Sequence, residues 1–563
     1  MSSRLAHALL RRSRPIGLVA WGLLVLALAG GPLAADEPEV TWLLDWSEPV
    51  YPTVFTGDLR DLPRAAAWEP GDPIVEIPRR STRPTTPVTP PEPELDALLA
   101  LQAARGEAGE AIGAPILNFI GGPFSGVNPP DTVGDAGPAH YVQLINFTGG
   151  SEIRVYNKAG GLIVGPTALD SLGTGNCANG LGDPIVLYDQ FADRWLLSEF
   201  SSSGNRLCIY ISQTGNPVSG GWWAYQFTAT NFPDYPKYGV WRDGYYVGTN
   251  ESNPAAYALQ RSAMLTGAAA IGIRFTAPDL SGFPFQMLPP ADADGSTPPP
   301  VGAPAVFLRH KDSEAHGSPG SPDTVELFEF HADFVTPANS TYTGPIGINV
   351  TEFDSDLCGL VSFSCIPQGG GALLDPLREV VMHRPQYRHW ANHQAIVGSF
   401  ATDVNGSNLA GVRWFELRKT AATWSLFQEG TYSLDAVSRW MSSIAMDGDG
   451  NIALGYNAAN AATFPGLRYT GRTAADPLGT MGAETTLIAG SASNASNRYG
   501  DYASLNVDPY DDCTFWFTGE YNPAAQWSTR IGTFKFPPAE CTAPFFSDGF
   551  ESGDTFAWTV TSP

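Results

Sequence analysis

The feature that most constrains the fold is a repeated unit. In it, a short apolar strand is followed by a turn containing Asp or Gly and by a second strand with an aromatic residue near its start. Copies occur at residues 183–200, 238–251, 443–456 and 504–521, with a looser copy at 131–146. Turn aspartates stand at positions 135, 189 and 243, two steps of 54 residues, and again at 447 and 508. Self-similarity at such a period indicates a repeat architecture.

Two further units fit the interval between turn positions 243 and 447. One pairs residues 304–309 with 324–330, and the other pairs 395–403 with 411–417. The stretch between them is expected to be an insertion that carries Cys358 and Cys365. Seven units of about 55–65 residues predict an all-β fold, a β-propeller with seven four-stranded blades. A two-sheet sandwich would strain to hold the roughly 28 strands that this implies.

A ring of blades also predicts a closing contact. The apolar segment 116–119 precedes the first unit and is expected to complete the sheet of the last blade beside residues 530–536. That pairing would leave no open edge.

The N-terminus reads as an export signal. Four arginines are followed by an apolar run at 16–29 and by small residues at 30–35, ahead of the first acidic residue, Asp36. This is the order of a secretory signal peptide. The run is too short to cross a bilayer core of roughly 30 Å, so we expect no retained transmembrane anchor. The chain is therefore predicted to be exported, and to be secreted or to reside at the outer surface or in the periplasm.

The rest of the chain divides into three parts. Residues 36–111 form a Pro-rich extension, with a linker over 70–93 and a short helix over 94–106. Proline-rich composition favours an extended, semi-rigid linker. The propeller is expected over residues 112–541 and a C-terminal tail over 542–563.

Six cysteines in an exported chain predict disulfides. Their grouping favours three bonds: Cys177 with Cys208, Cys358 with Cys365, and Cys513 with Cys541. The last would pin the chain end to the final blade. A Cys-x-x-Cys pair does not occur, so redox catalysis and thiolate zinc sites lack support.

Charge limits the partners. The formal net charge is −25, and removal of residues 1–35 would leave 28 basic against 57 acidic residues. This balance excludes nucleic acid as an expected partner. An acidic surface can bind divalent cations, although self-repulsion for solubility explains the same composition. No cofactor is fixed by the sequence, and Ca²⁺ is the one that the composition admits.

Two acidic segments are candidates for a calcium site. Residues 447–451 resemble the start of a calcium loop, but its twelfth position is Ala458, which supplies no carboxylate, so a hairpin turn is the better interpretation. The better cation candidate is the cluster of Asp508, Asp511 and Asp512. His383, His389 and His393 are a further, weaker metal candidate through their imidazole nitrogens.

Four groups of residues carry a family resemblance: 128–135, 232–237, 439–447, and 500–504 with 511–516. They resemble segments of uncharacterised secreted bacterial β-propeller-like proteins, over most of residues 115–540. The resemblance implies a fold and export, and no activity. The Gly-Phe-Glu-Ser-Gly segment at 549–553 resembles a short acidic-aromatic tail of many exported bacterial proteins, where a sorting signal and an ordinary frayed terminus are both open.

In a propeller, the innermost strand of each blade starts at one mouth of the central channel, so polar residues there are expected to converge. The candidates are Asp131, Asp183, Asp234, Lys237, His393, Arg439, Arg498 and Asp501. They predict an axial ligand or cation site. The alternative is that they cap turns and pair with one another.

A sialidase-like hydrolase, of the kind built on a propeller with Asp-box repeats, is a second interpretation. Such enzymes hold a substrate carboxylate with three arginines and attack with a tyrosine. Arg388, Arg439 and Arg498 recur at equivalent places, with Tyr502 and Asp501 nearby. An Arg-Ile-Pro segment and a complete Asp-box do not occur, and arginines paired with turn aspartates would give the same pattern.

The sequence does not identify a reaction. It lacks His-Glu-x-x-His, Gly-x-Ser-x-Gly and a phosphate-binding glycine loop, so zinc peptidase, serine hydrolase and nucleotide chemistry have no support. The first hypothesis is an exported module that binds an extracellular glycan, peptide or protein at its axial face. The alternative is a carbohydrate-active hydrolase in the same cavity. A structural envelope protein would be favoured if apolar side chains plugged the channel.

Overall fold

The computed structural model describes residues 40–41, 43–80, 95–105, 112–359 and 363–537. The chain divides into two compact units, Met1–Glu37 and Pro38–Pro563, and all described residues belong to the second. The predicted signal peptide, most of the Pro-rich linker, Cys541 and the C-terminal tail lie outside the described residues. The part of the chain that is described contains no helix with the length and apolarity needed to cross a membrane.

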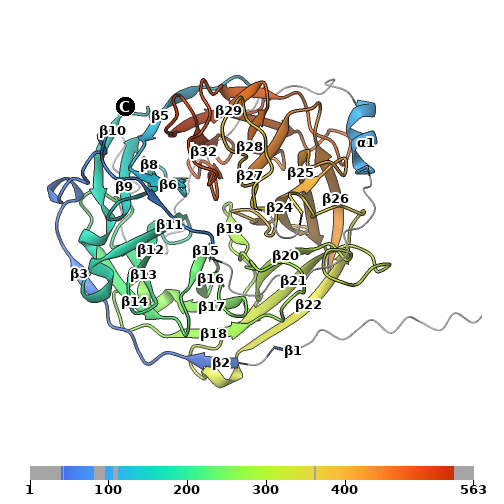
Figure 1. Cartoon of the computed structure of the whole chain (residues 1–563). Helices are drawn as coiled ribbons and strands as arrows, with labels where there is room; N and C mark the ends of the chain where they lie inside the picture. The colour runs from blue at the N-terminus through green and yellow to red at the C-terminus, as the bar shows by residue number, and fades with distance from the viewer. Residues whose placement is uncertain (1–39, 42, 81–94, 106–111, 360–362, 538–563) are drawn as a thin grey trace, which may run out of the picture. The chain divides into compact units, whose positions relative to one another are not determined.

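Seven sheets of four or five strands form a seven-bladed β-propeller, which confirms the predicted fold and blade number (Figure 1). Blade 1 comprises β7 (Val133–Ala136), β8 (His140–Phe147), β9 (Gly150–Asn157) and β10 (Leu162–Ala168). Blade 2 comprises β11 (Gly180–Asp189), β12 (Arg194–Ser201), β13 (Arg206–Ser212) and β14 (Trp222–Thr228). Blade 3 comprises β15 (Asp234–Val240), β16 (Gly244–Asn250), β17 (Ala255–Gln260) and β18 (Gly272–Thr276).

The second half of the ring repeats the pattern. Blade 4 comprises β20 (Ala305–Lys311), β21 (Thr324–His331) and β22 (Thr341–Asn349). Blade 5 comprises β19 (Asp292–Asp294), β23 (Gln386–His389), β24 (Gln394–Asp403), β25 (Ala410–Lys419) and β26 (Trp424–Tyr432). Blade 6 comprises β27 (Ser438–Met446), β28 (Ile452–Asn460), β29 (Thr463–Arg472) and β30 (Thr485–Ile488). Blade 7 comprises β31 (Ser504–Val507), β32 (Phe515–Tyr521) and β33 (Ser528–Phe534).

The ring closes as the sequence predicts. Strand β5 (Leu117–Pro123) pairs antiparallel with β33, with Phe119 opposite Ile531 and Leu117 opposite Thr533. The buried Thr529 hydroxyl ties this seam to blade 1, because it accepts hydrogen bonds from Gly122 N (2.7 Å) and from Gln143 Nε2 (3.0 Å). The first and last parts of the propeller are thus joined by main-chain and side-chain bonds.

The N-terminal extension lies along the blades, which the sequence had not predicted. Strand β1 (Val40–Thr41) pairs with β22, β2 (Leu43–Trp46) with β18, and β3 (Thr53–Phe55) with β14, so it covers the outer edges of blades 4, 3 and 2. Strand β4 (Val75–Glu76) then pairs in parallel with β6 (Val127–Asn128) beside blade 1. Covering exposed edges suppresses unwanted strand pairing.

Short helices occupy the connections. They are η1 (Leu59–Asp61), α1 (Leu98–Arg105), η2 (Leu169–Leu172), η3 (Gly175–Ala178), α2 (Arg261–Met264) and η4 (Pro337–Asn339). Helix α1 corresponds to the predicted helix, and its buried Gln102 exchanges hydrogen bonds with the main chain of Met481 (3.0 and 2.9 Å). The extension is therefore anchored again beside blade 6.

The core lies within and between the blades, where alternate strand residues pack face to face. Seven tryptophans are fully buried there: Trp195, Trp222, Trp241, Trp414, Trp440, Trp516 and Trp527. Two predicted disulfides are confirmed, Cys177–Cys208 and Cys358–Cys365, with Cα–Cα distances of 5.6 and 5.0 Å. The third predicted bond involves Cys541, which lies outside the described residues.

Ring closure should depend on the Thr529 hydroxyl. The substitution Thr529→Val keeps the shape and removes the acceptor for two buried donors, so we expect the free energy of unfolding to fall by about 1–3 kcal/mol. Chemical denaturation of the mature protein measures this. Thr341→Val, at an exposed position of β22, is the matched control and should change little. Equal stabilities of the two variants would contradict a role for the hydroxyl.

Candidate axial site

The innermost strands share an unusual backbone conformation where they begin. Five residues there have φ between 48° and 60°: Asp131, Asp183, Tyr235, Met441 and Asp501. In β11, β15 and β27 the strand register shifts at these positions. Such bulges re-aim side chains, and the left-handed conformation is strained for Tyr and Met. We call this end of the channel the entry mouth, and its geometry is repeated around the ring.

Four carboxyl groups come together at the entry mouth. Asp131, Asp183, Asp234 and Asp501 are 1%, 5%, 9% and 6% exposed. Burial, together with the carboxylates of Asp501 and Asp183, holds the pKa of Asp131 well above its usual range. Burial also raises the pKa of Asp183; Lys237 opposes this shift and the Asp501 carboxylate adds to it.

A buried ammonium group balances part of this charge. Lys237 is 1% exposed, and its Nζ lies 3.5 Å from the ring centroid of Tyr235 and 3.7 Å from that of Tyr502. Burial lowers the pKa of Lys237 to about 8, against the opposing effect of the Asp183, Asp131 and Asp501 carboxylates. Contact with two aromatic faces stabilises the cation where water is excluded.

Arg498 and His383 complete the group. Arg498 pairs with Asp501 and is also close enough to influence Asp131. The ring of His383 lies 6.0 Å from that of Tyr502, and both of its nitrogens are buried without a hydrogen-bond partner among the described residues. Burial, with Lys237 and Arg384 nearby, lowers its pKa well below the usual value, so the imidazole is neutral.

A segment of the N-terminal extension crosses the entry mouth; we call residues 75–80 the axial strap. Its main chain is held at several points: Val75 N donates to Gly126 O (2.8 Å), Ile77 N donates to Asn128 O (2.8 Å), Ile77 O accepts from Arg498 (2.7 Å), and Arg80 O accepts from Asn250 (3.2 Å). The contacted residues lie at β6 beside blade 1, in β16 of blade 3 and in the segment before β31 of blade 7. The strap therefore spans the mouth rather than following one blade.

Strap side chains add further contacts. Glu76 accepts hydrogen bonds from Asn128 (2.8 Å) and Ser496 (2.7 Å). The Arg80 guanidinium lies 3.9 Å from the Phe232 ring centroid, and its Nε lies 3.9 Å from Asp234. Arg79 enters a pocket and pairs with Asp375 and Glu379. Two cations of the strap thus meet the acidic mouth.

Seven predicted site residues converge here, and three do not. Those together are Asp131, Asp183, Asp234, Lys237, Arg498, Asp501 and Tyr502. Arg388 instead pairs with Asp512, and Arg439 with Glu484 (2.8 Å) and Asp435 (3.0 Å). His393 lies in the β23–β24 turn and contacts Asn392 (2.7 Å).

The three arginines of the sialidase-like hypothesis do not form one site. Arg388, Arg439 and Arg498 each pair with different carboxylates, and within the described residues no ion pair joins two of them to one acid. Each arginine is instead paired with one or two carboxylates of its own, as in the alternative interpretation, although the partner is not a turn aspartate in every case. Arg439 and Arg498 pair with acids nearby in sequence, whereas Arg388 pairs with a turn aspartate of another blade.

The predicted cation cluster is likewise dispersed. Asp508 pairs with Lys158 (2.6 Å), Asp511 accepts from the Thr514 hydroxyl (2.6 Å), and Asp512 pairs with Arg388. In the described residues, the acidic group compact enough for a metal is Asp312, Glu314 and Asp323. Their oxygens already accept main-chain N–H groups. Residues 447–451 form the expected hairpin turn, closed by Asp447 N to Asn451 O (2.9 Å).

The opposite end of the channel holds charges that the sequence had not singled out. Arg384 is fully buried between Asp292 and Asp294. Asp135 accepts a hydrogen bond from Tyr188 N in the next blade (2.8 Å), and burial raises the pKa of Asp135 to about 7. Asp292 likewise accepts from Val240 N (2.7 Å). These carboxyl groups therefore join different blades to one another.

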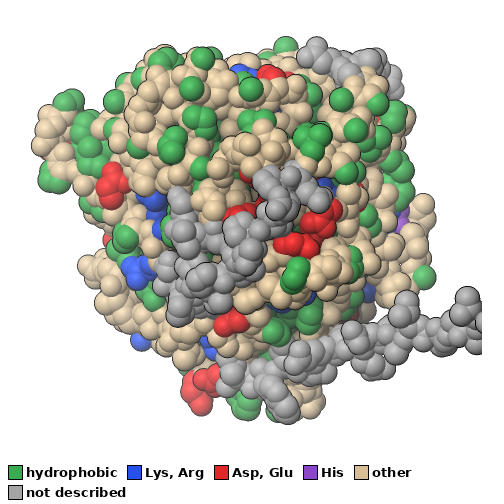
Figure 2. Space-filling model, turned by 45° about the vertical axis from the view of Figure 1, so that its right-hand side comes forward, with side chains coloured by type: hydrophobic (Ala, Val, Ile, Leu, Met, Phe, Trp, Pro, Cys, Tyr) green, Lys and Arg blue, Asp and Glu red, His purple; other side chains and the backbone are tan. Residues whose placement is uncertain are grey.

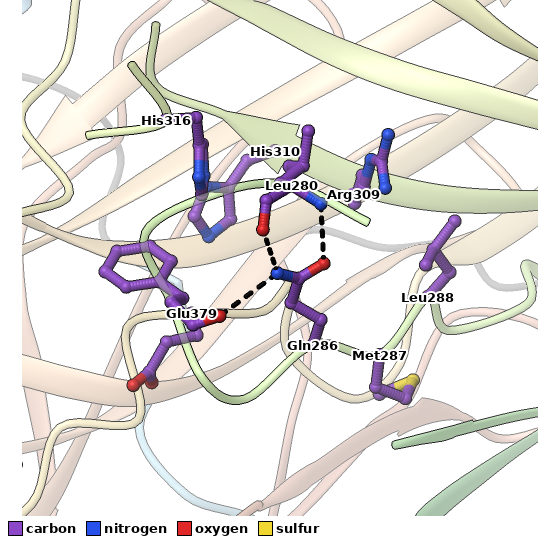
Figure 3. A pocket seen from close by; sticks show the side chains of 9 residues that line it. Leu280, Gln286, Met287, Leu288, Arg309, His310, His316 and Glu379 are labelled. Carbon is purple, nitrogen blue, oxygen red and sulfur yellow. Dashed lines mark hydrogen bonds between the residues drawn. The ribbon is translucent and has the colours of Figure 1, made fainter. Parts of the chain in front are cut away.

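A small pocket adjoins the strap beside Glu379 (Figure 3). It is lined by Leu280, Phe283, Gln286, Met287, Leu288, Arg309, His310, His316 and Glu379. The Gln286 amide bonds the main chain of Leu280 and Phe283, which fixes the loop. Burial lowers the pKa of His310 to about 3 and of His316 to about 4. The free space suits about one water molecule.

The strap contacts were missed because their partners are distant in sequence. The signals that were available are an adjacent arginine pair, Arg79-Arg80, in the extension of an acidic chain, and the short loop between Cys358 and Cys365. Figure 2 shows acidic side chains gathered near the middle of the face it draws, as the net charge of −25 leads one to expect.

Comparisons with known proteins give no family. No protein-family model and no curated protein sequence matches the chain. Among solved structures, an ulvan lyase, described as a new family of polysaccharide lyase, matches at 11% identity with a TM-score of 0.32, over 74% of this chain and 95% of that one. The WD40 domain of SCAP from fission yeast matches at 9% identity and 0.29, over 69% and 81%. TM-scores this low carry no argument about function.

The carboxyl cluster predicts a pH effect at Asp234. Burial and the Asp183 carboxylate raise its pKa to about 7. The folded protein therefore holds a proton that the unfolded chain releases near pH 4, so stability falls as pH rises from about 4 to 7. Asp234→Asn removes this titration. We expect the melting temperature of the variant, minus that of the wild type, to increase across this range.

The control is Asp333→Asn. Hydrogen bonds, chiefly from Thr336 N, lower the pKa of the exposed Asp333, so its contribution is complete above pH 4 and the same difference should stay flat. A flat profile for Asp234→Asn as well would show that the cluster is not desolvated as described.

Proposed function

We propose that this chain is an exported propeller module that binds an extended polypeptide across its entry mouth. The observation that carries the proposal is that the mouth already holds one such segment, the axial strap. A peptide partner is one of the three classes that the sequence left open, and the strap favours it over a glycan or a folded surface.

The strap is held largely through its main chain. Four of its peptide groups bond to the propeller, two through the β4–β6 pairing and two through Arg498 and Asn250. Recognition of this kind adds a strand to an exposed edge and leaves side-chain pockets to set specificity. Because the contacts are to the backbone, another extended segment can make them equally well.

The ligand is expected to be cationic. The mouth holds four buried or nearly buried carboxyls against Lys237 and Arg498, and the strap adds Arg79 and Arg80. A basic segment would also be steered toward a protein of strong negative charge. Extracellular location follows from the predicted signal peptide and agrees with the two disulfides.

A second candidate, a carbohydrate-active hydrolase, is favoured by one observation. Asp131 and Asp183 are buried carboxyls close enough to influence each other, and burial raises the pKa of both; a pair of carboxyl groups with distinct roles is what glycoside hydrolysis uses. Reducing-sugar release from a panel of acidic and neutral glycans tests this. Release that is lost in Asp131→Asn would support the hydrolase, and no release from any glycan would eliminate it for that panel.

Peptide binding can be measured directly with a labelled peptide of residues 72–80. In the wild type the tethered strap competes at high effective concentration. The variant Glu76→Ala, Ile77→Pro loses the Glu76 hydrogen bonds and the Ile77 N–H donor. We therefore expect the mature variant to bind the peptide at least about tenfold more tightly than the wild type in fluorescence anisotropy.

The matched control changes the peptide and not the protein. N-methylation at Val75 and Ile77 removes both main-chain donors and should abolish binding, while the charge and side chains are kept. Equal, weak binding of the unmodified peptide to both proteins would overturn the proposal. If a glycan binds in place of the peptide, as detected by a rise in melting temperature, the proposed ligand would be a glycan and not a peptide.

A further inference from the structure

The side chain of Arg79 occupies a pocket built by four residues of the propeller, outside the strap. They are Phe285, Phe363, Asp375 and Glu379, and we call them the arginine pocket. Arg79 is separated from Asp375 and Glu379 by 296 and 300 residues, and its side chain is only 6% exposed. The contact is therefore long-range and nearly dry.

The contacts match the shape of a guanidinium group. One terminal nitrogen donates to both Asp375 oxygens (2.8 and 2.9 Å), and the other donates to Glu379. The rings of Phe363 and Phe285 lie 4.3 and 4.9 Å from the guanidinium carbon. Planar stacking combined with forked hydrogen bonding distinguishes arginine from lysine, whose ammonium is a compact point charge.

The propeller unit holds these residues in place without the strap. Asp375 N donates to Asn497 O (3.0 Å), and an Asp375 oxygen accepts from Leu377 N (2.9 Å). Phe363 lies in the loop closed by the Cys358–Cys365 disulfide, and Arg378 stacks over the same ring at 5.4 Å. The pocket is thus preformed, which lowers the cost of filling it.

Charge makes an empty pocket unfavourable. Glu379 also pairs with Arg378 (3.2 Å), so two carboxylates share two guanidinium groups. Without Arg79, one buried negative charge would be left unbalanced, and leaving a buried charge unpaired is strongly destabilising. The pocket therefore requires a cation that fits it.

We propose that the arginine pocket is a recognition site for an arginine side chain of a partner polypeptide, filled in this structure by Arg79. The inference rests on the proposed peptide-binding function and specifies it. A partner segment places its arginine two residues after the peptide carbonyl that Arg498 binds, in the position of Arg79. Partner binding at this pocket is an exchange of one arginine for another.

Chemical rescue tests the pocket without any peptide. Arg79→Ala should lower the melting temperature of the mature protein, and millimolar ethylguanidinium should restore at least about 1 °C in a saturable manner. Ethylammonium should not, and neither compound should stabilise the wild type. Asp375→Asn in the Arg79→Ala background should abolish rescue. If the Arg79→Ala protein does not fold, Arg79→Gln, which keeps a long uncharged side chain at this position, takes its place in the experiment.

No rescue, or equal rescue by ethylammonium, would overturn the inference. A second experiment separates it from the proposed function: the 72–80 peptide with citrulline at position 79 keeps the shape but loses the charge. Tight binding of the arginine peptide and at least about tenfold weaker binding of the citrulline peptide support the pocket. Equal binding of the two peptides would agree with main-chain recognition but would contradict recognition by the arginine pocket. If neither peptide binds, the proposed peptide-binding function is itself contradicted.

Discussion

The rest of the structure depends on the closing contact between β5 and β33, because every blade relies on two neighbours to bury its faces. Segment 117–123 is the first strand of the propeller in sequence, and it completes the last sheet. Within the ring, carboxyl groups also join the blades to one another, since Asp135 and Asp292 each accept a main-chain N–H from another blade. Closure fixes the relative positions of seven strand starts, and so it fixes the entry mouth.

That mouth concentrates features that cost stability. Tyr235 and Met441 adopt left-handed backbone angles, each at an expense of order 1–3 kcal/mol, and the Asp131 carboxyl is buried next to other acids. Backbone strain and buried charge are retained only where the surrounding contacts hold them in place. Such features cluster at functional sites. A purely structural protein would be expected to fill the channel with apolar side chains. The described residues at the entry mouth instead form a charged network.

The sequence predicts the fold well and the site in part. Seven units could be counted because strand, turn and aromatic recur locally, and the closing strand follows from the absence of any other partner for residues 116–119. Six axial residues could be named because they stand at the starts of the innermost strands, and Tyr502 because it follows Asp501 in the sialidase-like pattern. Arg388 and Arg439 were misplaced because an arginine's partner depends on neighbours that periodicity does not reveal. The strap escaped prediction because a Pro-rich segment has no period, and Arg79 meets its partners about 300 residues away.

The charge balance of the mouth explains why the strap is best regarded as a resident ligand. The strap side chains of Val75 and Arg80 are exposed, so little apolar burial holds the segment down, whereas Arg79 is deeply inserted. Removing the strap into water would strand the Asp375 and Glu379 charges with one cation between them. Simple opening is therefore disfavoured, and replacement by a second arginine keeps every charge paired throughout. A site built in this way stays closed to neutral and acidic chains and admits a basic one, which is specificity obtained from electrostatics rather than from a shaped cavity.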